Sequence, residues 1–377
     1  MVDDLRAPLV GWFRANARDL PWRHDPTPYR VWVSEIMLQQ TRVETVVGYY
    51  DRFLRRFPTL ESLAHARLED VLAAWSGLGY YRRARLLHAG ARAVVDDHGG
   101  ELPRAEADIR RIPGIGPYTA GAILSIAFGE RAPILDGNGK RILSRLFAVE
   151  GDVSKAPAAR RLWDLARALV RDGSPSEVNQ AQMELGALVC TPTSPSCADC
   201  PVSFACAAHR AGTVSRYPRL PTRRAPVDVE CVVALVTSGD RVLLRRRVSG
   251  ELHEGLWDLP GGFTGDAGDV GTDASRAREL VPLSLRFGPR VGEIRHMVTH
   301  RRVRLLVHAV SLREPVVWQT LVSSGGATLA WFEREAALAL ALPAPTRRVL
   351  TELWSREPSR RPARPARPPR PPRATAA

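Results

Sequence analysis

The sequence lacks any apolar run that could cross a membrane. A membrane helix needs about 18 consecutive apolar residues, and the longest candidate, 336–342, is far shorter. The first residues, Met1-Val2-Asp3-Asp4, also lack the basic and then apolar plan of a secretory signal. We therefore expect a soluble cytoplasmic protein of the bacterial type, with no membrane partner.

Lysine and cysteine are both scarce. Lys140 and Lys155 are the only lysines, so arginine supplies almost all of the 54 basic residues, which outnumber the 40 acidic ones and give a net charge of +14. A basic excess indicates a polyanionic partner, most simply nucleic acid, although a general bias toward arginine would give the same charge. The 5 cysteines are not expected to form disulfides in an intracellular chain.

The chain length and the changes in residue pattern along the sequence predict two domains and a tail. The 377 residues exceed the usual ~100–200 of one domain. Apolar residues at three- and four-residue steps, with Thr59 placed as a helix cap, predict an all-α domain over 1–212. A connector rich in proline and arginine, 213–227, leads to β-rich runs at 230–237, 241–248 and 303–310, which predict an α/β domain over 228–355. Ser238-Gly239-Asp240 predicts a turn between the first two runs. Residues 356–377 hold seven arginines, seven prolines and one acid, so we expect a disordered basic tail.

Four of the cysteines lie close together in the sequence. They are Cys190, Cys197, Cys200 and Cys206, separated by six, two and five residues. Four thiolates can cage a zinc ion or an iron–sulfur cluster, and the spacing alone favours zinc. Cys231 lies in a strand run and is interpreted as a small buried hydrophobic residue.

A glycine-containing turn, Pro113-Gly114-Ile115-Gly116, directly precedes a helical run over 122–128. Backbone N–H groups exposed at such a turn, at a helix N-terminus, can bind a phosphate. An ordinary corner between two helices is the alternative. In a basic all-α domain the pattern favours a helix-hairpin-helix motif, with Gly114 and Gly116 at a DNA phosphate.

Two acids are candidates for chemistry. Glu35 lies in the apolar segment 31–41, where burial would raise its pKa and let it hold a proton near neutrality. Asp136 lies just before another predicted helix. The plain alternatives are a first-turn glutamate that suits the helix dipole and an N-cap aspartate.

Together, the segments 32–41, 77–81, 113–124 and 135–141 and the four cysteines resemble adenine DNA glycosylases of the endonuclease III branch of the helix-hairpin-helix superfamily. The resemblance covers the helical domain and extends, more weakly, into the second. It implies a monofunctional, monomeric, nucleoid-associated enzyme that removes adenine from A:8-oxoguanine or A:G mispairs in double-stranded DNA. It also reverses the preference for zinc and implies one [4Fe-4S] cluster on the loop 190–206.

The resemblance assigns roles to particular residues. Glu35 would protonate adenine N7 and later activate water, and the Asp136 carboxylate would face the sugar cation. Tyr118, near Glu35, and Asn138 would assist. Bifunctional relatives have a Schiff-base lysine where this chain has Tyr118, which implies no strand cleavage, although Lys140 leaves weak lyase activity open.

Further residues match positions that contact the DNA in the family. Four match the lining of the adenine pocket: Leu20, Trp22, Arg23 and Gln180. Gln40 and Tyr80 match residues that wedge into the duplex around the 8-oxoguanine.

The second domain resembles a Nudix fold at 255–262 and 278–280. Because residues 281–284 replace the glutamates that would bind magnesium, we expect a recognition module and no pyrophosphate hydrolysis. The family's Phe-Ser-His loop, which contacts 8-oxoguanine, corresponds to Val298-Thr299-His300. Thr299 and His300 would keep the polar contacts, while the aromatic wedge is lost.

Three other classes compete. An endonuclease III-like pyrimidine glycosylase with lyase activity is disfavoured by Tyr118 and by the added domain. A Nudix nucleotide hydrolase lacks its metal-binding acids. A non-enzymatic iron–sulfur regulator would leave Glu35 and Asp136 without a purpose.

Overall fold

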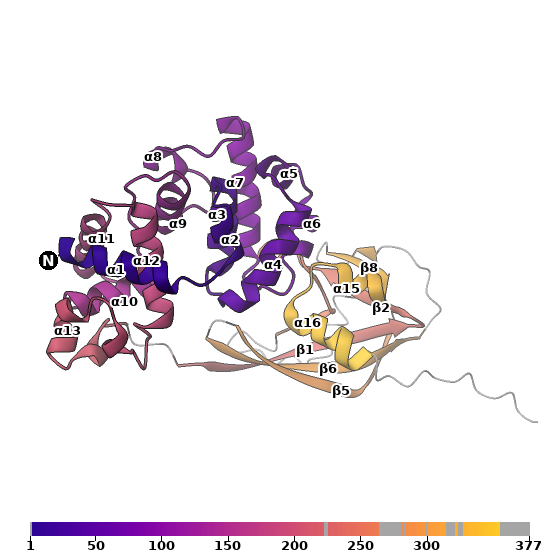
Figure 1. The fold of residues 1–377 in the computed structure, drawn as a ribbon. Coiled ribbons are helices and arrows are strands. Elements are labelled where there is room, and N and C mark those ends of the chain that lie inside the picture. Colours follow the sequence, from indigo (N-terminus) through magenta and orange to yellow (C-terminus); the bar gives the residue numbers. More distant parts are fainter. Residues whose placement is uncertain are drawn as a thin grey trace, which may run out of the picture. The chain divides into compact units, whose positions relative to one another are not determined.

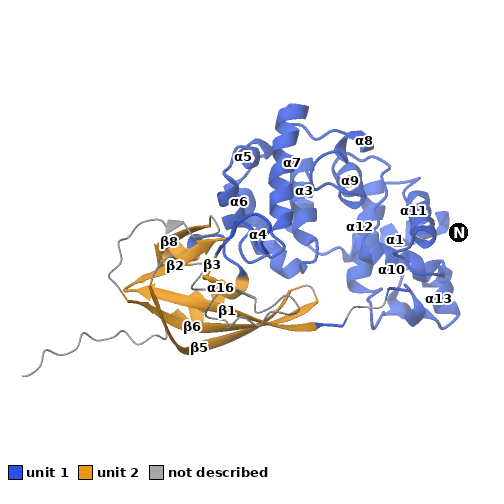
Figure 2. Ribbon diagram, turned by 180° about the vertical axis from the view of Figure 1, so that it is seen from behind, with its two compact units in different colours: residues 1–226, 247–257, 339–343 blue, residues 227–246, 258–338, 344–377 orange. Residues whose placement is uncertain are grey.

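The computed structural model describes residues 2–221, 225–263, 281, 284–298, 300–313, 321–322 and 327–354. It divides the chain into two compact units (Figure 2). Unit 1 comprises residues 1–226, 247–257 and 339–343, and unit 2 comprises 227–246, 258–338 and 344–377. The first boundary falls in the expected connector, and two short segments of the expected second domain belong to unit 1. The expected tail, 356–377, lies outside the described residues.

Unit 1 is built from helices (Figure 1). The α-helices are α1 (Asp3–Asn16), α2 (Pro21–His24), α3 (Pro28–Leu38), α4 (Val43–Arg56), α5 (Leu60–Ala64), α6 (Leu68–Ala74), α7 (Arg82–His98), α8 (Glu106–Ile109), α9 (Pro117–Ala122), α10 (Gly137–Leu146), α11 (Ala156–Leu169), α12 (Pro175–Leu188) and α13 (Ala207–Arg210). A π-helical turn, η1 (Ile123–Ala127), and the 3₁₀ turns η2 (Cys197–Asp199), η3 (Ser203–Ala205) and η4 (Val214–Arg216) complete it.

Local sequence signals set many of the helix starts. The side chain of Thr59 accepts a hydrogen bond from the Ser62 backbone N–H, and the Ser62 side chain accepts one from Thr59, so the predicted cap of α5 is confirmed as a capping box. Helices α2, α3, α9 and α12 each begin with a proline. Proline suits this position because the missing N–H would have had no partner in the helix.

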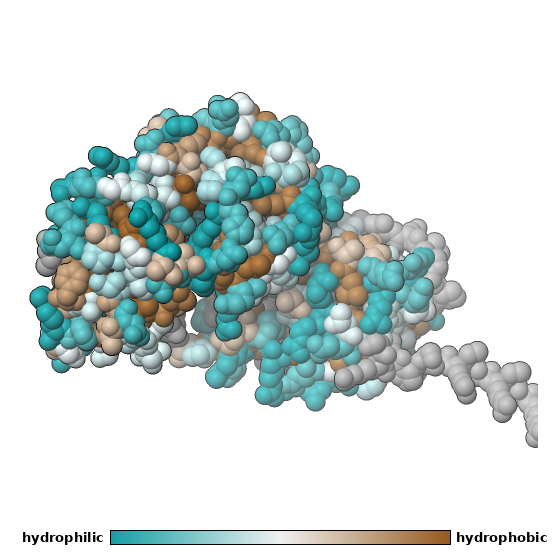
Figure 3. Space-filling model, viewed as in Figure 1, coloured by the Kyte–Doolittle hydropathy of each residue, from teal (hydrophilic) through white to brown (hydrophobic). Residues whose placement is uncertain are grey.

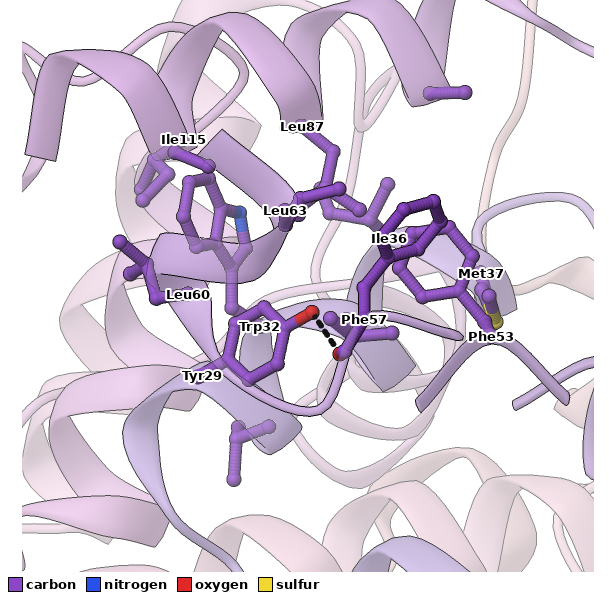
Figure 4. Close-up of a cluster of buried hydrophobic side chains, with 14 of the residues drawn as sticks. Tyr29, Trp32, Ile36, Met37, Phe53, Phe57, Leu60, Leu63, Leu87 and Ile115 are labelled. Atoms are coloured by element: carbon purple, nitrogen blue, oxygen red, sulfur yellow. Dashed lines mark hydrogen bonds between the residues drawn. The ribbon is translucent and has the colours of Figure 1, made fainter. Parts of the chain in front are cut away.

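The centre of the unit 1 core lies around α3 (Figure 4). Every residue from 31 to 37 is buried, and Trp32 and Phe53 are fully enclosed. The rings of Phe53 and Trp75 pack edge to face at 5.8 Å, and the Tyr29 hydroxyl donates a hydrogen bond of 2.8 Å to the Phe57 carbonyl. Helix α3 is therefore held by packing on all sides, which fixes the side chains that it carries.

The helix predicted over 122–128 differs from the structure. The α-helix ends at Ala122 and gives way to the wider turn η1. Within this turn the Ser125 hydroxyl donates to the Gly121 carbonyl at 2.7 Å and accepts from Asn179 at 2.8 Å. Side-chain bonding to a carbonyl four residues earlier competes with the regular helical ladder, so the sequence period alone missed the change.

The described residues of unit 2 form an eight-stranded sheet. Its strands are β1 (Val227–Ser238), β2 (Arg241–Arg246), β3 (Trp257–Asp258), β4 (Gly261–Phe263), β5 (Leu285–Val298), β6 (Arg301–Leu312), β7 (Leu321–Val322) and β8 (Thr328–Glu333). The order is β5-β6-β1-β2-β8-β7, with β3 beside β2 and β4 beside β1. Strands β1 and β6 run parallel, which requires a long connection between them. Three short helical elements follow: α15 (Arg334–Ala339), α16 (Ala344–Arg348) and η5 (Val349–Leu353).

The three predicted β-runs correspond to β1, β2 and β6. The predicted turn is a two-residue hairpin at Gly239-Asp240, because Ser238 pairs with Arg241. Cys231 is buried at 4% exposure, as expected of a small hydrophobic residue. In the view of Figure 3, polar residues cover much of the surface of unit 1. None of the helices among the described residues is long and apolar enough to cross a membrane.

Gly121, in α9, allows the backbone at Pro133 to pack closely against this helix. A Cβ built there would lie 2.0 Å from the Pro133 carbonyl oxygen, whereas a Cβ on Gly11, in α1, would meet nothing within 4 Å. We expect Gly121→Ala to lower the free energy of unfolding by ~1–3 kcal/mol, because a rigid backbone must shift. The matched Gly11→Ala should raise it by about 0.5–1 kcal/mol, since alanine favours helix.

Urea denaturation of both full-length variants, followed by helical circular dichroism, measures the difference. A Gly121→Ala variant as stable as Gly11→Ala would contradict the close packing of α9.

Candidate functional site

One cavity of unit 1, about 560 Å³ in volume, brings together nine of the predicted site residues. They come from α2, α3, α9, α10 and α12 and from the segment that follows α3. The predicted residues that line it are Leu20, Trp22, Arg23, Glu35, Gln40, Tyr118, Asp136, Asn138 and Gln180. Segments more than 150 residues apart in the sequence therefore meet at one place, as a binding site requires.

Glu35 is the buried acid of this cavity, with 4% exposure. It is the eighth residue of α3, so the alternative of a first-turn glutamate is wrong, because the helix begins at Pro28. The Tyr118 hydroxyl donates a hydrogen bond of 2.6 Å to Glu35 Oε2. Burial raises the pKa of Glu35 to about 7 and the negative charge of Asp136 adds to this, while the Tyr118 hydrogen bond and the charge of Arg23 oppose it. A carboxyl in this state can give up a proton at neutral pH.

Asp136 caps α10. Its Oδ1 accepts a hydrogen bond of 2.6 Å from the Gly139 N–H, so the N-cap interpretation is confirmed. The same residue lines the cavity. Burial raises its pKa, and the N–H groups of Gly139 and Asn138 and the charge of Arg141 oppose the rise. The capping role and a place facing the cavity are therefore compatible.

Asn138 is held by a neighbour. Its Oδ1 accepts a hydrogen bond of 2.7 Å from Arg141 Nη2, which also donates to the Gly186 carbonyl, while Arg141 Nε donates to the Cys190 carbonyl. Arg141 thus joins the start of α10 to the end of α12 and to the first cysteine of the loop.

Glu184 is a cavity residue that the sequence interpretation missed. It is 1% exposed and binds two arginines, with 2.9 Å from Oε1 to Arg18 Nε and 2.9 Å from Oε2 to Arg23 Nη2. Burial acts against its ionisation, but hydrogen bonds from Arg18 and Arg23 outweigh it and lower the pKa of Glu184 to about 2. A spacing of four residues from Gln180 places both on one face of α12, so the sequence could place Glu184 beside Gln180 but could not show its ion pairs.

Gln40 and Tyr80 have unusual backbones. Gln40 lines the cavity and Tyr80 does not. Both residues are exposed, and their φ angles are +57° for Gln40 and +49° for Tyr80. Such a conformation costs a non-glycine residue of order 1–3 kcal/mol and is typical of functional sites. Among the described residues, Ala148 and His253 are the other non-glycine residues with positive φ.

The predicted hairpin joins α8 to α9. Gly114 has a φ of +84°, and a Cβ there would lie 2.9 Å from the Leu86 Cβ, so this turn requires glycine. Gly116 is the N-cap residue of α9. Their contact with a DNA phosphate stays a prediction.

The four cysteines Cys190, Cys197, Cys200 and Cys206 line a second, small cavity of about 30 Å³ at the end of α12. Arg145 Nη1 donates a hydrogen bond of 3.3 Å to Cys190 Sγ, and burial raises the pKa of Cys200 to about 11. No three His, Cys, Asp or Glu side chains in the described ranges converge closely enough to hold a single metal ion.

The predicted lesion loop lies between β5 and β6 in unit 2. His300 is exposed at this turn. Thr299 lies outside the described residues, as do 278–280 and residues 282–283 of the segment that replaces the Nudix glutamates.

Comparisons with known proteins agree with this fold. Residues 33–168 match the family described as HhH-GPD superfamily base excision DNA repair protein, and residues 231–352 match the NUDIX domain. The predicted fold class, a helix-hairpin-helix glycosylase domain followed by a Nudix-like α/β domain, is therefore confirmed.

Named relatives cover most of the chain. Adenine DNA glycosylase of Rattus norvegicus is 37% identical, over 90% of this chain and 77% of the relative. The Homo sapiens enzyme of the same name is 33% identical, over 95% and 75%. The solved structure of a thermostable thymine-DNA glycosylase is 30% identical and covers 56% of this chain and 97% of its own, with a TM-score of 0.52. The chain therefore belongs to the adenine DNA glycosylase family and is a DNA glycosylase of base excision repair.

Proposed function

We propose that this enzyme removes adenine from A:8-oxoguanine and A:G mispairs in double-stranded DNA, with Glu35 as the proton donor. The observation that carries the proposal is a buried carboxyl with a pKa of about 7 in a cavity of about 560 Å³. A base must leave the duplex before its glycosidic bond can be reached, and this volume falls in the usual range for a small-molecule site.

The surrounding groups suit cleavage of an N-glycosidic bond. Protonated Glu35 delivers its proton to adenine N7, which makes the base a better leaving group and builds positive charge on the sugar. The Asp136 carboxylate, held by the cap of α10, stabilises that charge. Glu35, now ionised, then activates the water that completes hydrolysis. Asn138 and Gln180 line the same cavity and offer hydrogen bonds to the sugar and the base.

The reaction stops at hydrolysis. Tyr118 has no amine with which to form a Schiff base, and its hydroxyl is engaged with Glu35. Lys140 is the lysine nearest to Asp136 and Tyr118 in the sequence. It is not among the described residues that line the cavity. Both observations support a monofunctional enzyme.

Lesion recognition is assigned to unit 2. The turn with His300 presents an imidazole that can donate or accept a hydrogen bond at the altered edge of 8-oxoguanine. Val298, the last residue of β5, provides apolar bulk without the π-face that a phenylalanine would stack on the base. The preference for 8-oxoguanine over guanine should therefore be present but modest. A monomeric state and association with the nucleoid stay predictions.

We also propose that the four loop cysteines hold one [4Fe-4S] cluster. The donor set fits, because all four thiols line one cavity and Arg145 offsets negative charge at Cys190. A [4Fe-4S] cluster is held by four cysteine thiolates, and this loop supplies four. When bound, the cluster would tie the loop 190–206 into one rigid piece.

A duplex assay tests the function. Single-turnover excision should be seen on A:8-oxoguanine and A:G duplexes and absent on thymine glycol. Glu35→Gln should lower the rate by at least ~10²–10⁴, because the amide cannot donate a proton and then act as a base, while mispair binding is retained. Glu130→Gln, at an exposed glutamate, is the matched control. Excision by Glu35→Gln at the wild-type rate would remove Glu35 from the reaction.

The pH dependence tests how Glu35 is tuned. Since its acid form is the reactive one, the rate should fall as the pH rises through about 7. The Tyr118 hydrogen bond lowers the pKa of Glu35. Tyr118→Phe should therefore move this fall in rate, the alkaline limb of the pH profile, to higher pH. The measurement is the single-turnover rate from pH 5 to 9. An alkaline limb that moves to lower pH in Tyr118→Phe would show that another group controls it.

Metal analysis tests the cluster. The purified protein should be brown and contain about four irons and four sulfides per chain. Cys200→Ala should lose iron, while Cys231→Ala, at the buried cysteine of unit 2, should keep it. One zinc per chain and no colour would show that the site is a structural zinc site.

A further inference from the structure

Arg83 is a buried cation that the mechanism above does not use. It lies in the first turn of α7 and is only 9% exposed. Its Nη1 donates to the carbonyls of Ile36 and Met37 at 2.8 Å each and of Gln39 at 2.5 Å. Its Nη2 donates to Thr41 Oγ1 at 3.1 Å and to the carbonyls of Leu78 and Gly79 at 3.4 and 3.2 Å. One guanidinium therefore meets six oxygens.

These oxygens belong to two segments that are far apart in the sequence. The first is the end of α3 with the segment 39–41, which forms part of the cavity lining. The second is the turn 78–80 before α7. Each segment carries one exposed residue with positive φ, Gln40 in the first and Tyr80 in the second. Two of the four strained non-glycine residues in the described ranges are thus held by the same side chain.

The aromatic neighbours complete the arrangement. The guanidinium carbon lies 5.6 Å from the centre of the Tyr80 ring and 5.5 Å from that of the Trp75 ring. Trp75 Nε1 donates to the Gly79 carbonyl, the same oxygen that Arg83 binds. Tyr80 is therefore fixed both through its own backbone turn and through its ring, although half of its surface is open to solvent.

Only an arginine can make this set of contacts. A guanidinium presents five N–H donors in a rigid planar fork, whereas the ammonium of lysine is a point with three. Burial lowers the pKa of Arg83 to about 10 and its Nε lacks a hydrogen-bond partner, so this charge is kept in the interior at a cost. An apolar residue would fill the space, but it would leave the carbonyls that end α3 without donors.

We propose that Arg83 is a positioning residue that locks the segment 39–41 to the turn 78–80, so that Gln40 and Tyr80 enter a DNA duplex as one rigid pair. This inference rests on the proposed function in taking mispaired DNA as the ligand. It concerns how the duplex is opened and leaves the proton transfer to Glu35.

Mispair binding measures this role separately from excision. Equilibrium binding is compared for a duplex with one A:G mispair and for the matched duplex, using full-length protein with Glu35→Gln so that the substrate stays intact. Adding Arg83→Lys should reduce the preference for the mispair about tenfold, the order expected when one stacked base contact is lost. Binding to the matched duplex should change less than about twofold, because phosphate contacts dominate it. Arg92→Lys, at an exposed arginine of the same helix, is the control.

A double-mutant cycle distinguishes positioning from a general loss of stability. If Gln40 and Tyr80 act as one unit, Gln40→Ala and Tyr80→Ala together should cost much less than the product of their separate effects on mispair preference. In the Arg83→Lys background the two effects should become independent. The pH at which the excision rate falls should not move in Arg83→Lys, because the pKa of Glu35 is set by burial and by Tyr118, Asp136 and Arg23.

Each outcome decides the inference. A folded Arg83→Lys variant with full mispair preference would overturn it. If Arg83→Lys does not fold, the cycle in the Arg83 background decides: independent effects of Gln40 and Tyr80 overturn the inference and coupled effects support it. Wild-type protein that excises no adenine, together with a Glu35→Gln protein that shows no preference for the mispair, would instead overturn the proposed function.

Discussion

A carboxyl that stays protonated near neutral pH is the constraint on which the rest of the site depends. Helix α3 supplies it by placing Glu35 among residues that are buried without interruption from 31 to 37. Burial alone does not keep Glu35 protonated, because a nearby cation would lower the pKa of Glu35 again. Arg23 is such a cation, and its guanidinium is bound to Glu184, which also binds Arg18. The ion pairs on α12 therefore limit how far Arg23 can draw the proton from Glu35.

The two carboxyls that face the cavity are satisfied in different ways. Glu35 receives one hydrogen bond, from a tyrosine, whereas Asp136 receives backbone N–H groups at the start of α10. Burial raises the pKa of both carboxyls, to about 7 at Glu35, but backbone donors favour the ionised form and oppose the rise at Asp136. The same N-cap also starts a helix that reaches, through Arg141 and Arg145, to the cysteine loop. Helix α10 therefore helps to position both the cavity and the cysteine loop.

Several features could be predicted from the sequence because they are local. The cap at Thr59, the turn at Gly239-Asp240 and the glycine at Gly114 each follow from what a short stretch of backbone needs. The π-helical turn at 123–127 could not, because it depends on Ser125 and its partner Asn179, 54 residues away. Glu184 was missed because its role depends on arginines in another part of the chain, Arg18 and Arg23.

The sequence by itself determined which chemical groups are available: an acid in an apolar segment, an aspartate before a helix, a tyrosine in place of a lysine, and four closely spaced thiols. It also determined that helices precede a sheet. Only the tertiary structure decided that Glu35, Tyr118 and Asp136 share a cavity, that Glu35 lies deep in α3 and not in its first turn, and that Arg83 joins two distant turns. The physical reason is that pKa values and buried ion pairs depend on which side chains surround a group, and folding sets those neighbours.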